Sequence, residues 1–453
     1  MSDALCGVGA WAWIAASLAL AGCSGDDTVG LVPDAAASSI VDATAPSDGS
    51  RDAAVDAGLD ASALDGSGDA SSTDAARDAS VPLQGVVGLA GTATSVAGST
   101  SFCALLSDGS VRCWGNDGYG QSGTGAPASP YVTPLPVEPL GLAFGVSIVA
   151  VGDTFAGAVQ EGSTLLWGDD SVGELGNDAV APSYTPRLVT GLGGATALSL
   201  GGEAGCVVIA GAVSCWGSNA FGNVGTGTTA VQRAPVAIGV DASKVAVSQH
   251  ACALAPGGSV VCWGRDDFGQ LGRTTTSTCT TASVPCAPDP APSSLTAGAT
   301  GLSVGLDFTC AIAPRPGDAG SAVAAQCWGD NRDGQLGGGT ADALQHVAPV
   351  VVTGLAGVPS QLAAGGAFAC ALVAGGAVQC WGADDRGQLG TPTAAAPPVI
   401  VVTGATAVAA GAATACAVLE AGTVECWGAN DQGQLGIGSV DQDVHPPTLV
   451  LAR

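Results

Sequence analysis

The stretch Cys380–Gly390 reads "CWGADDRGQLG", and seven copies of it decide the fold. The others read "CWGNDGYGQSG" from Cys113, "LWGDDSVGELG" from Leu166, "CWGSNAFGNVG" from Cys215, "CWGRDDFGQLG" from Cys262, "CWGDNRDGQLG" from Cys327 and "CWGANDQGQLG" from Cys426. Self-similarity at a period of about 50 residues is the signature of a repeat architecture. Each copy holds one tryptophan, which predicts seven blade-packing positions: Trp114, Trp167, Trp216, Trp263, Trp328, Trp381 and Trp427.

A β-hairpin is predicted immediately before each tryptophan. In "CALVAGGAVQCWG", two short apolar runs flank a three-residue loop, Ala374 to Gly376. Its last residue must be left-handed, a conformation that glycine adopts without a steric clash. Glycine recurs at this place as Gly109, Gly162, Gly258 and Gly422. The third copy is one residue shorter, which predicts a two-residue turn at Ala210 and Gly211.

Two further β-type runs precede each hairpin, such as "APVVVTGL" and "SQLAAGG". Four short strands per repeat are typical of a propeller blade. The sequence therefore predicts an all-β, seven-bladed propeller over residues 82–453. The tail from Pro446, "PPTLVLAR", and the head from Pro82, "PLQGVVGL", both resemble the first strand of a repeat, so one is redundant. We expect the tail to complete the sheet beside the first blade.

The pattern of the seven copies resembles the repeat of the regulator of chromosome condensation family. The resemblance covers roughly residues 82–453 and implies a seven-bladed propeller. Eukaryotic members act on chromatin and catalyse nucleotide exchange on a small GTPase. This chain has a net charge of −27 and only 12 lysines and arginines, whereas phosphate contacts need basic side chains. We therefore expect neither nucleic-acid binding nor exchange activity.

Cysteines number 16, and all but Cys6 and Cys23 fall into neighbouring pairs. In the second repeat, Ala156 and Leu166 stand at the equivalent positions, so both cysteines are missing together. Facing residues of antiparallel strands lie within disulfide reach. Zinc is the disfavoured alternative, because short C-x-x-C spacings are lacking and histidines are few. The predicted disulfides are Cys103–Cys113, Cys206–Cys215, Cys252–Cys262, Cys279–Cys286, Cys310–Cys327, Cys370–Cys380 and Cys416–Cys426.

The N-terminus predicts export, in agreement with an oxidising compartment. Residues 4–23 carry no charge and end in "LAGC", which resembles a bacterial lipobox. We expect residues 1–22 to be a lipoprotein signal segment and Cys23 to be lipidated, placing the protein on the periplasmic or cell-surface side of a bacterial envelope. A signal peptide normally begins with positive charge. Asp3 departs from this pattern, and the alternative is an uncleaved membrane anchor.

Residues 24–84 hold 12 aspartates and two arginines among alanines and serines. Such a composition buries too little apolar surface to fold. We therefore expect a disordered tether over residues 23–81. It lacks the glutamate-terminated loop that binds calcium in EF-hands.

No catalytic constellation is visible in the sequence, and we expect no enzyme activity, cofactor or metal. Arginines are few and scattered along the chain. His250 stands where other copies carry Ser101, Phe308, Phe368 or Thr414, so it is a structural variant, and the remaining histidines are His346 and His445. Aspartates at turns usually accept hydrogen bonds from nearby backbone N–H groups. This explains the recurring pairs Asp169/Asp170, Asp266/Asp267 and Asp384/Asp385.

Two insertions interrupt the repeats, at residues 273–298 and 313–326. The first follows the last strand of a blade and the second precedes it, so they should emerge on opposite faces. Propeller loops are where binding is usually built. We expect a monomeric, non-catalytic binding or scaffold module that presents loops to a protein partner. A surface enzyme acting on polysaccharide is the alternative.

Overall fold

The computed structural model describes residues 81–92, 100–279, 284–295, 297–317, 322–390 and 398–453. The chain divides into two units, Met1–Asp69 and Ala70–Arg453, and the described residues all belong to the second. The predicted signal segment, the lipidation site Cys23 and the tether up to residue 80 lie outside them.

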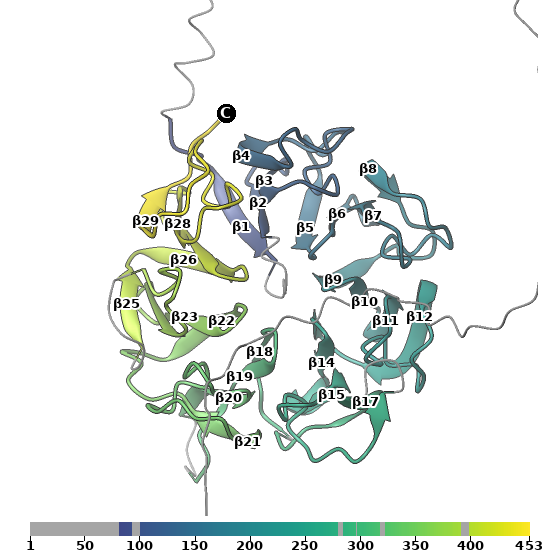
Figure 1. The fold of residues 1–453 in the computed structure, drawn as a ribbon, viewed down its shortest axis with the longest axis vertical. Coiled ribbons are helices and arrows are strands. Elements are labelled where there is room, and N and C mark those ends of the chain that lie inside the picture. Colours follow the sequence, from purple (N-terminus) through teal and green to yellow (C-terminus); the bar gives the residue numbers. More distant parts are fainter. Residues whose placement is uncertain (1–80, 93–99, 280–283, 296, 318–321, 391–397) are drawn as a thin grey trace, which may run out of the picture. The chain divides into compact units, whose positions relative to one another are not determined.

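Seven antiparallel sheets form a ring around a central axis and make a seven-bladed propeller (Figure 1). The innermost strands of blades 1 to 7 are β1 (Val86–Gly91), β5 (Val146–Val151), β9 (Ala195–Gly201), β13 (Lys244–Val247), β18 (Gly301–Val304), β22 (Pro359–Ala364) and β26 (Ala405–Ala410). The second strands are β2 (Ser101–Leu106), β6 (Phe155–Gln160), β10 (Ala204–Ile209), β14 (His250–Leu254), β19 (Phe308–Pro314), β23 (Phe368–Val373) and β27 (Thr414–Leu419). The third are β3 (Val111–Asn116), β7 (Ser163–Gly168), β11 (Ala212–Gly217), β15 (Val260–Arg265), β20 (Val323–Gly329), β24 (Ala377–Gly382) and β28 (Val424–Gly428). The outermost are β4 (Val132–Val137), β8 (Ser183–Leu188), β12 (Gln232–Asp241), β17 (Val284–Pro292), β21 (His346–Val351), β25 (Val399–Val402) and β29 (His445–Leu449).

The predicted four strands per repeat are present, but the blade begins one strand later than the sequence suggested. The run "APVVVTGL", interpreted as the first strand of a repeat, forms β21, and Val350 pairs with Cys327 of the preceding strand β20. The turn after β20 reverses the chain, so the following segment, β21, pairs antiparallel with β20 in the same blade. It is therefore the last strand of one blade and not the first of the next.

Both ends of the propeller have a structural place. The tail forms β29, the outermost strand of blade 7, where Thr448 pairs with Cys426. The head is not redundant, because its continuation forms β1, the innermost strand of blade 1, where Ala90 pairs with Cys103. Head and tail also meet directly: the N–H of Leu83 donates to the carbonyl of Val450 at 2.8 Å.

Each blade packs its tryptophan against the second and third strands of the blade before it, and in six of the seven joints these strands carry a cysteine pair; in the seventh, Trp216 packs with Leu166. Six of the predicted cysteine pairs face one another on the second and third strands as disulfides, with Cα–Cα distances of 4.0 to 4.1 Å. Cys370 and Cys380 of blade 6, for example, share a buried cluster with Trp427 of blade 7. All seven tryptophan side chains are fully buried. The repeated stretch thus forms the joint between successive blades.

A closed circle of hydrogen bonds runs through these joints. Every indole N–H donates to a backbone carbonyl of the repeated stretch in the preceding blade. The acceptor is the third-last residue of that stretch, the Gln of "GQLG" in most copies. The pairs, with N–O distances, are Trp114–Gln434 2.9 Å, Trp167–Gln121 2.7 Å, Trp216–Glu174 2.7 Å, Trp263–Asn223 2.9 Å, Trp328–Gln270 3.0 Å, Trp381–Gln335 2.9 Å and Trp427–Gln388 3.0 Å.

The hairpin of blade 2 has a shorter turn than the sequence suggested and resembles that of blade 3, where Ala210 and Gly211 form the predicted two-residue turn between Ile209 and Ala212. The sequence suggested that Ala156 faces Leu166, but the residue paired with Leu166 is Gly157. The hairpin has a two-residue turn, in which Glu161 (φ 49°) and Gly162 (φ 78°) are both left-handed. Because this turn is one residue shorter than a three-residue loop, Leu166 pairs with Gly157 and not with Ala156. Gly157 leaves room for the Leu166 side chain, because a Cβ there would lie 2.5 Å from Leu166 Cδ2.

Candidate functional site

Seven polar turns lie on one face of the propeller, which we call the turn face. They follow the third strands and span residues 117–122, 170–175, 219–224, 266–271, 331–336, 384–389 and 430–435. The loops between first and second strands share this face, since backbone N–H groups after the third strand donate to their carbonyls, as from Asp330 to Asp307 at 2.9 Å. The opposite, hairpin face carries the loops between second and third strands.

The first residue of every turn is a cap, as the sequence predicted for the aspartate pairs, and its side chain is buried in six turns and half-buried at Asp384. Its Oδ1 accepts the backbone N–H five residues later. The caps and their distances are Asp117 2.8 Å, Asp170 3.0 Å, Asn219 2.9 Å, Asp266 2.9 Å, Asn331 3.3 Å, Asp384 3.0 Å and Asn430 3.2 Å. These seven side chains hold the turns.

The residue two positions after each cap reaches the surface and differs from copy to copy. It is half-buried or exposed in every blade. Blades 1 to 4 carry apolar or aromatic residues there, and blades 5 to 7 carry polar ones, in the order Tyr119, Val172, Phe221, Phe268, Asp333, Arg386 and Gln432. The turn face therefore has an apolar part and a charged part.

A stack of alternating rings and guanidinium groups crosses blades 3 to 5 of this face. Arg265 Cζ lies 5.5 Å from the ring centre of Phe221 and 5.8 Å from that of Phe268. Arg332 Cζ lies 4.4 Å from the ring centre of Phe268. These distances are within the range of cation–π attraction. We call Phe221, Arg265, Phe268 and Arg332 the arginine–phenylalanine stack.

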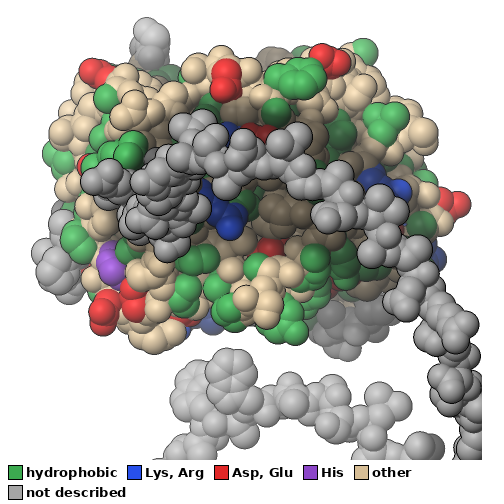
Figure 2. All heavy atoms as spheres, turned by 90° about the horizontal axis from the view of Figure 1, so that it is seen from above, with side chains coloured by type: hydrophobic (Ala, Val, Ile, Leu, Met, Phe, Trp, Pro, Cys, Tyr) green, Lys and Arg blue, Asp and Glu red, His purple; other side chains and the backbone are tan. Residues whose placement is uncertain are grey.

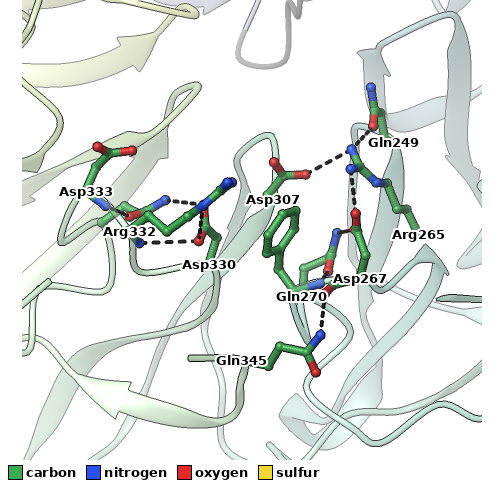
Figure 3. Close-up of polar contacts among 11 residues, drawn as sticks. Gln249, Arg265, Asp267, Gln270, Asp307, Asp330, Arg332, Asp333 and Gln345 are labelled. Carbon is green, nitrogen blue, oxygen red and sulfur yellow. Dashed lines mark hydrogen bonds and ion pairs between the residues drawn. The ribbon is translucent and has the colours of Figure 1, made fainter. Parts of the chain in front are cut away.

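Carboxylates and an amide fix the two guanidinium groups in place (Figure 3). Arg265 ends β15 and forms ion pairs with Asp267 at 2.6 Å and Asp307 at 3.1 Å, and it donates to the Gln249 side chain. Arg332 holds Asp330 with two parallel bonds, Nε–Oδ1 and Nη2–Oδ2, each 2.9 Å. Such bidentate pairs give geometric rigidity. The stack is therefore preorganised.

Asp307 is the most strongly perturbed carboxylate in this cluster. Burial raises its pKa to about 6, although the Arg265 guanidinium lowers it. Asp307 is thus ionised at neutral pH and remains an ion-pair partner of Arg265. Its electrostatic role is to hold an arginine.

Glu174 is exceptional among the turns, because the other six carry Gln or Asn at its position. Its Oε2 accepts the N–H of Val172 at 2.9 Å, but Oε1 is buried without a hydrogen-bond partner. In blade 6 the equivalent Gln388 donates its amide to Asp385 at 2.8 Å. Burial raises the pKa of Glu174 to about 7, and the charges of Asp169 and Glu203 act in the same direction. Glu174 thus places a carboxylate at a position where the other six turns have a side-chain amide.

The histidines have structural roles in the described structure. His250 is fully buried, its Nε2 lies 2.8 Å from Thr309 Oγ1, and burial lowers its pKa to about 3, so it is neutral. His346 and His445 each contact an aspartate four residues earlier, at 2.9 and 2.7 Å. Among the described residues, no cluster of histidine, cysteine and acidic side chains is arranged to hold a metal ion.

The two insertions leave the fold at opposite ends of equivalent third strands. The first does not follow the last strand of its blade, as the sequence suggested. It begins after β15 on the turn face and includes β17 itself. Its start adds a fifth strand, β16 (Thr278–Cys279), which pairs with β17 and is joined to it by the disulfide Cys279–Cys286. The second enlarges the β19–β20 hairpin, so the two emerge on opposite faces.

The sequence did not predict the arginine–phenylalanine stack, because its arginines are few and scattered along the chain. Arg265 and Arg332 occupy different positions of their copies, so a search for conserved motifs passes over them. One feature of the sequence could have indicated the stack: the position occupied by Phe221 and Phe268 carries a different kind of residue in most of the other copies. The fold brings these residues together because successive turns are neighbours on the turn face.

Charges are dispersed on the side of the propeller seen edge-on in Figure 2. Lysine and arginine side chains lie apart from one another there, among apolar, uncharged and acidic ones. Within the described part of the chain, no helix has the length and hydrophobicity needed to cross a membrane.

Comparison with known proteins supports the repeat assignment. The sequence profile of the Regulator of chromosome condensation (RCC1) repeat matches residues 96–121, 245–270, 360–388 and 405–434. Human E3 ubiquitin-protein ligase HERC2 is 31% identical over 153 residues, which cover 33% of this chain and 3% of that protein. Human probable E3 ubiquitin-protein ligase HERC4 is 46% identical over 65 residues, which cover 14% of this chain and 6% of that protein. The matches thus span only a few per cent of these curated relatives.

Solved structures show the same fold. Prp20p from Saccharomyces cerevisiae, in a study of its binding to Gsp1p and histones, superposes with a TM-score of 0.64 at 20% identity, over 79% of this chain and 87% of that one. Human WBSCR16 superposes with a TM-score of 0.62 at 20% identity, over 75% of this chain and 93% of that one. The chain thus contains RCC1 repeats, matched in four segments, and folds as a seven-bladed propeller.

Proposed function

We propose that the propeller is a non-catalytic scaffold whose turn face binds a protein partner. The observation that carries this proposal is the arginine–phenylalanine stack, built from residues that the repeat does not require. Aromatic and arginine side chains dominate the binding energy of protein interfaces. A stack already fixed by ion pairs loses little conformational entropy on binding.

The chemistry of the turns also favours binding over catalysis. The cap carboxylates Asp170, Asp266 and Asp384 are occupied by backbone N–H groups of their own turns. Asp267 and Asp307 are occupied by Arg265. These carboxylates, several of which are adjacent to another aspartate in the sequence, are thus engaged in structural hydrogen bonds or ion pairs.

We further propose that the protein acts at a bacterial cell envelope, lipid-anchored through Cys23. The support is the lipobox-like "LAGC" together with seven cysteine pairs in disulfide geometry, which persist in oxidising compartments. Mass spectrometry of the purified protein should find a lipidated Cys23 as the mature N-terminus. An intact Met1 or an unmodified Cys23 would contradict the anchor.

The binding proposal is tested by capturing partners from a cell-envelope extract with the full chain. The variant Phe221→Ala/Phe268→Ala should retain less than about a tenth of the captured partner, as expected when two hot-spot residues are truncated. The matched control is Phe144→Ala/Val358→Ala, which removes side chains that are 60% and 55% exposed on the hairpin face. Both variants should keep the wild-type unfolding temperature within a few degrees. Equal capture by wild type and the turn-face variant would refute the proposal.

The role of the first insertion can be tested without removing a strand of the propeller. Deleting residues 274–297 would remove β17, the outermost strand of blade 4, and would damage the sheet. Replacing Cys279 and Cys286 with serine is the milder change, because it opens the loop and leaves β17 in place.

A further inference from the structure

A depression of about 340 Å³ lies on the turn face over blades 5 to 7. Small side chains and Leu306 supply the apolar part of its lining, with Gly366, Ala367, Ala412 and Ala413 from the loops between first and second strands. None of the described residues that line it is aromatic. An apolar surface of this kind accommodates methylene groups.

Charged side chains from three successive turns complete the lining. They are Asp333, Asp385, Asp431 and Arg386, three carboxylates and one guanidinium. Asp385 accepts the amide of Gln388 and Asp431 that of Gln434, each at 2.8 Å, so these two carboxylates are held in position. Arg386 Nη1 lies 3.5 Å from Asp431, a long contact between partly exposed groups that leaves the depression acidic.

Of these three carboxylates only Asp431 forms an ion pair within the described residues. Asp385 is held by Gln388, whereas Asp333 is exposed. In Figure 3 it points away from the Arg332–Asp330 pair. Burial and the neighbouring charge of Asp330 raise its pKa, the Arg332 guanidinium lowers it, and the charge of Asp385 raises it. The depression thus holds like charges that repel one another, and an incoming cation would relieve this repulsion.

We propose that this depression binds a lysine side chain of the protein partner, an inference that rests on the protein-binding role of the turn face. The lysine stem would lie on the alanine and glycine surface, and its ammonium group would be placed among Asp333, Asp385 and Asp431. Lysine side chains commonly bury their stems in this way. Lysine fits better than arginine, because a guanidinium group gains from aromatic stacking and planar bidentate partners. The partner segment is therefore basic.

The probe for this proposal is a rhodamine-labelled peptide, Gly-Lys-Gly-Lys-Gly, titrated into the full chain at low salt and followed by fluorescence anisotropy. The variant Asp333→Asn/Asp385→Asn/Asp431→Asn should weaken binding roughly tenfold, as three partly exposed charge pairs allow. Arg386→Gln should strengthen binding roughly threefold, because it removes the competing positive charge. The same peptide with norleucine in place of lysine should bind at least tenfold more weakly to wild type.

The matched control is Asp108→Asn/Glu161→Gln/Glu420→Gln, which removes three exposed acidic charges from the hairpin face. This control should bind the lysine peptide within about twofold of wild type. Equal weakening by the two triple variants would show non-specific attraction to an acidic protein and would overturn the proposal, as would equal binding of the norleucine peptide.

The two proposals fail in different ways. One outcome is that the carboxylate substitutions leave binding of the lysine peptide unchanged, while Phe221→Ala/Phe268→Ala no longer captures the partner. The lysine site is then wrong, and the proposed scaffold function is retained. If that double variant captures the partner normally, the turn-face function itself is wrong, whatever the peptide does.

Discussion

Replacing Trp114 with alanine is expected to lower the free energy of unfolding by roughly 3–5 kcal/mol, the usual cost of removing a fully buried tryptophan. Trp114 is 1% exposed and packs with Cys416 and Cys426 of blade 7, across the junction where the ring closes. No peptide connection joins blades 7 and 1, so side chains and a few backbone bonds hold this junction. Chemical denaturation followed by circular dichroism measures the loss.

Two companion variants separate the causes. Trp114→Phe keeps a ring but leaves the Gln434 carbonyl without its indole donor, which should cost roughly 1–3 kcal/mol. Tyr131→Ala is the control, because this side chain is 68% exposed and its removal should change stability by less than about 0.5 kcal/mol. A loss for Trp114→Ala no larger than that for Tyr131→Ala would contradict the packing role.

Glu174→Gln is expected to stabilise the protein by roughly 2 kcal/mol at pH 8. Burial raises the pKa of Glu174 from 4.5 in the unfolded chain to about 7 in the folded one. The folded state therefore holds this proton more tightly, and wild-type stability falls as the pH rises from about 4.5 through 7. Glutamine supplies the amide donor present in the other turns and does not ionise.

The pH dependence distinguishes this effect from a general improvement in packing. The difference between Glu174→Gln and wild type should be small at pH 4.5 and should grow towards pH 8, as measured by denaturation at several pH values. The reverse change, Gln388→Glu, places a carboxylate in an equivalent turn and should destabilise at pH 8. A pH-independent difference for Glu174→Gln would contradict the buried-carboxylate account.

The fold could be predicted from the sequence because its information is repeated. One copy of "CWGADDRGQLG" is ambiguous, since its acidic residues could belong to a catalytic site. Seven copies assign Trp381 to packing and Asp384 to capping, and the structure places both so. The position in the repeat at which a blade begins could not be predicted. A periodic sequence does not show whether a given strand pairs with the strands before it or with those after it.

The candidate site was less predictable, for a physical reason. Its members Phe221, Arg265, Phe268 and Arg332 occupy variable positions of different copies and meet only because neighbouring turns share a face. The expectation that Ala156 faces Leu166 was wrong because a one-residue change in loop length shifts every pairing beyond it, and Gly157 takes that place. Repetition thus shows what builds the propeller, and departures from it show where to look for function.

Hydrogen exchange on the captured complex shows whether the partner occupies the turn face. The full chain, free and bound, would be exchanged in deuterated water and digested for mass spectrometry. We predict slower amide exchange on binding in residues 219–224, 266–271 and 331–336, with the hairpins around Gly109, Gly211 and Gly422 unchanged. Protection of those hairpins with unchanged exchange in the turns would contradict the claim.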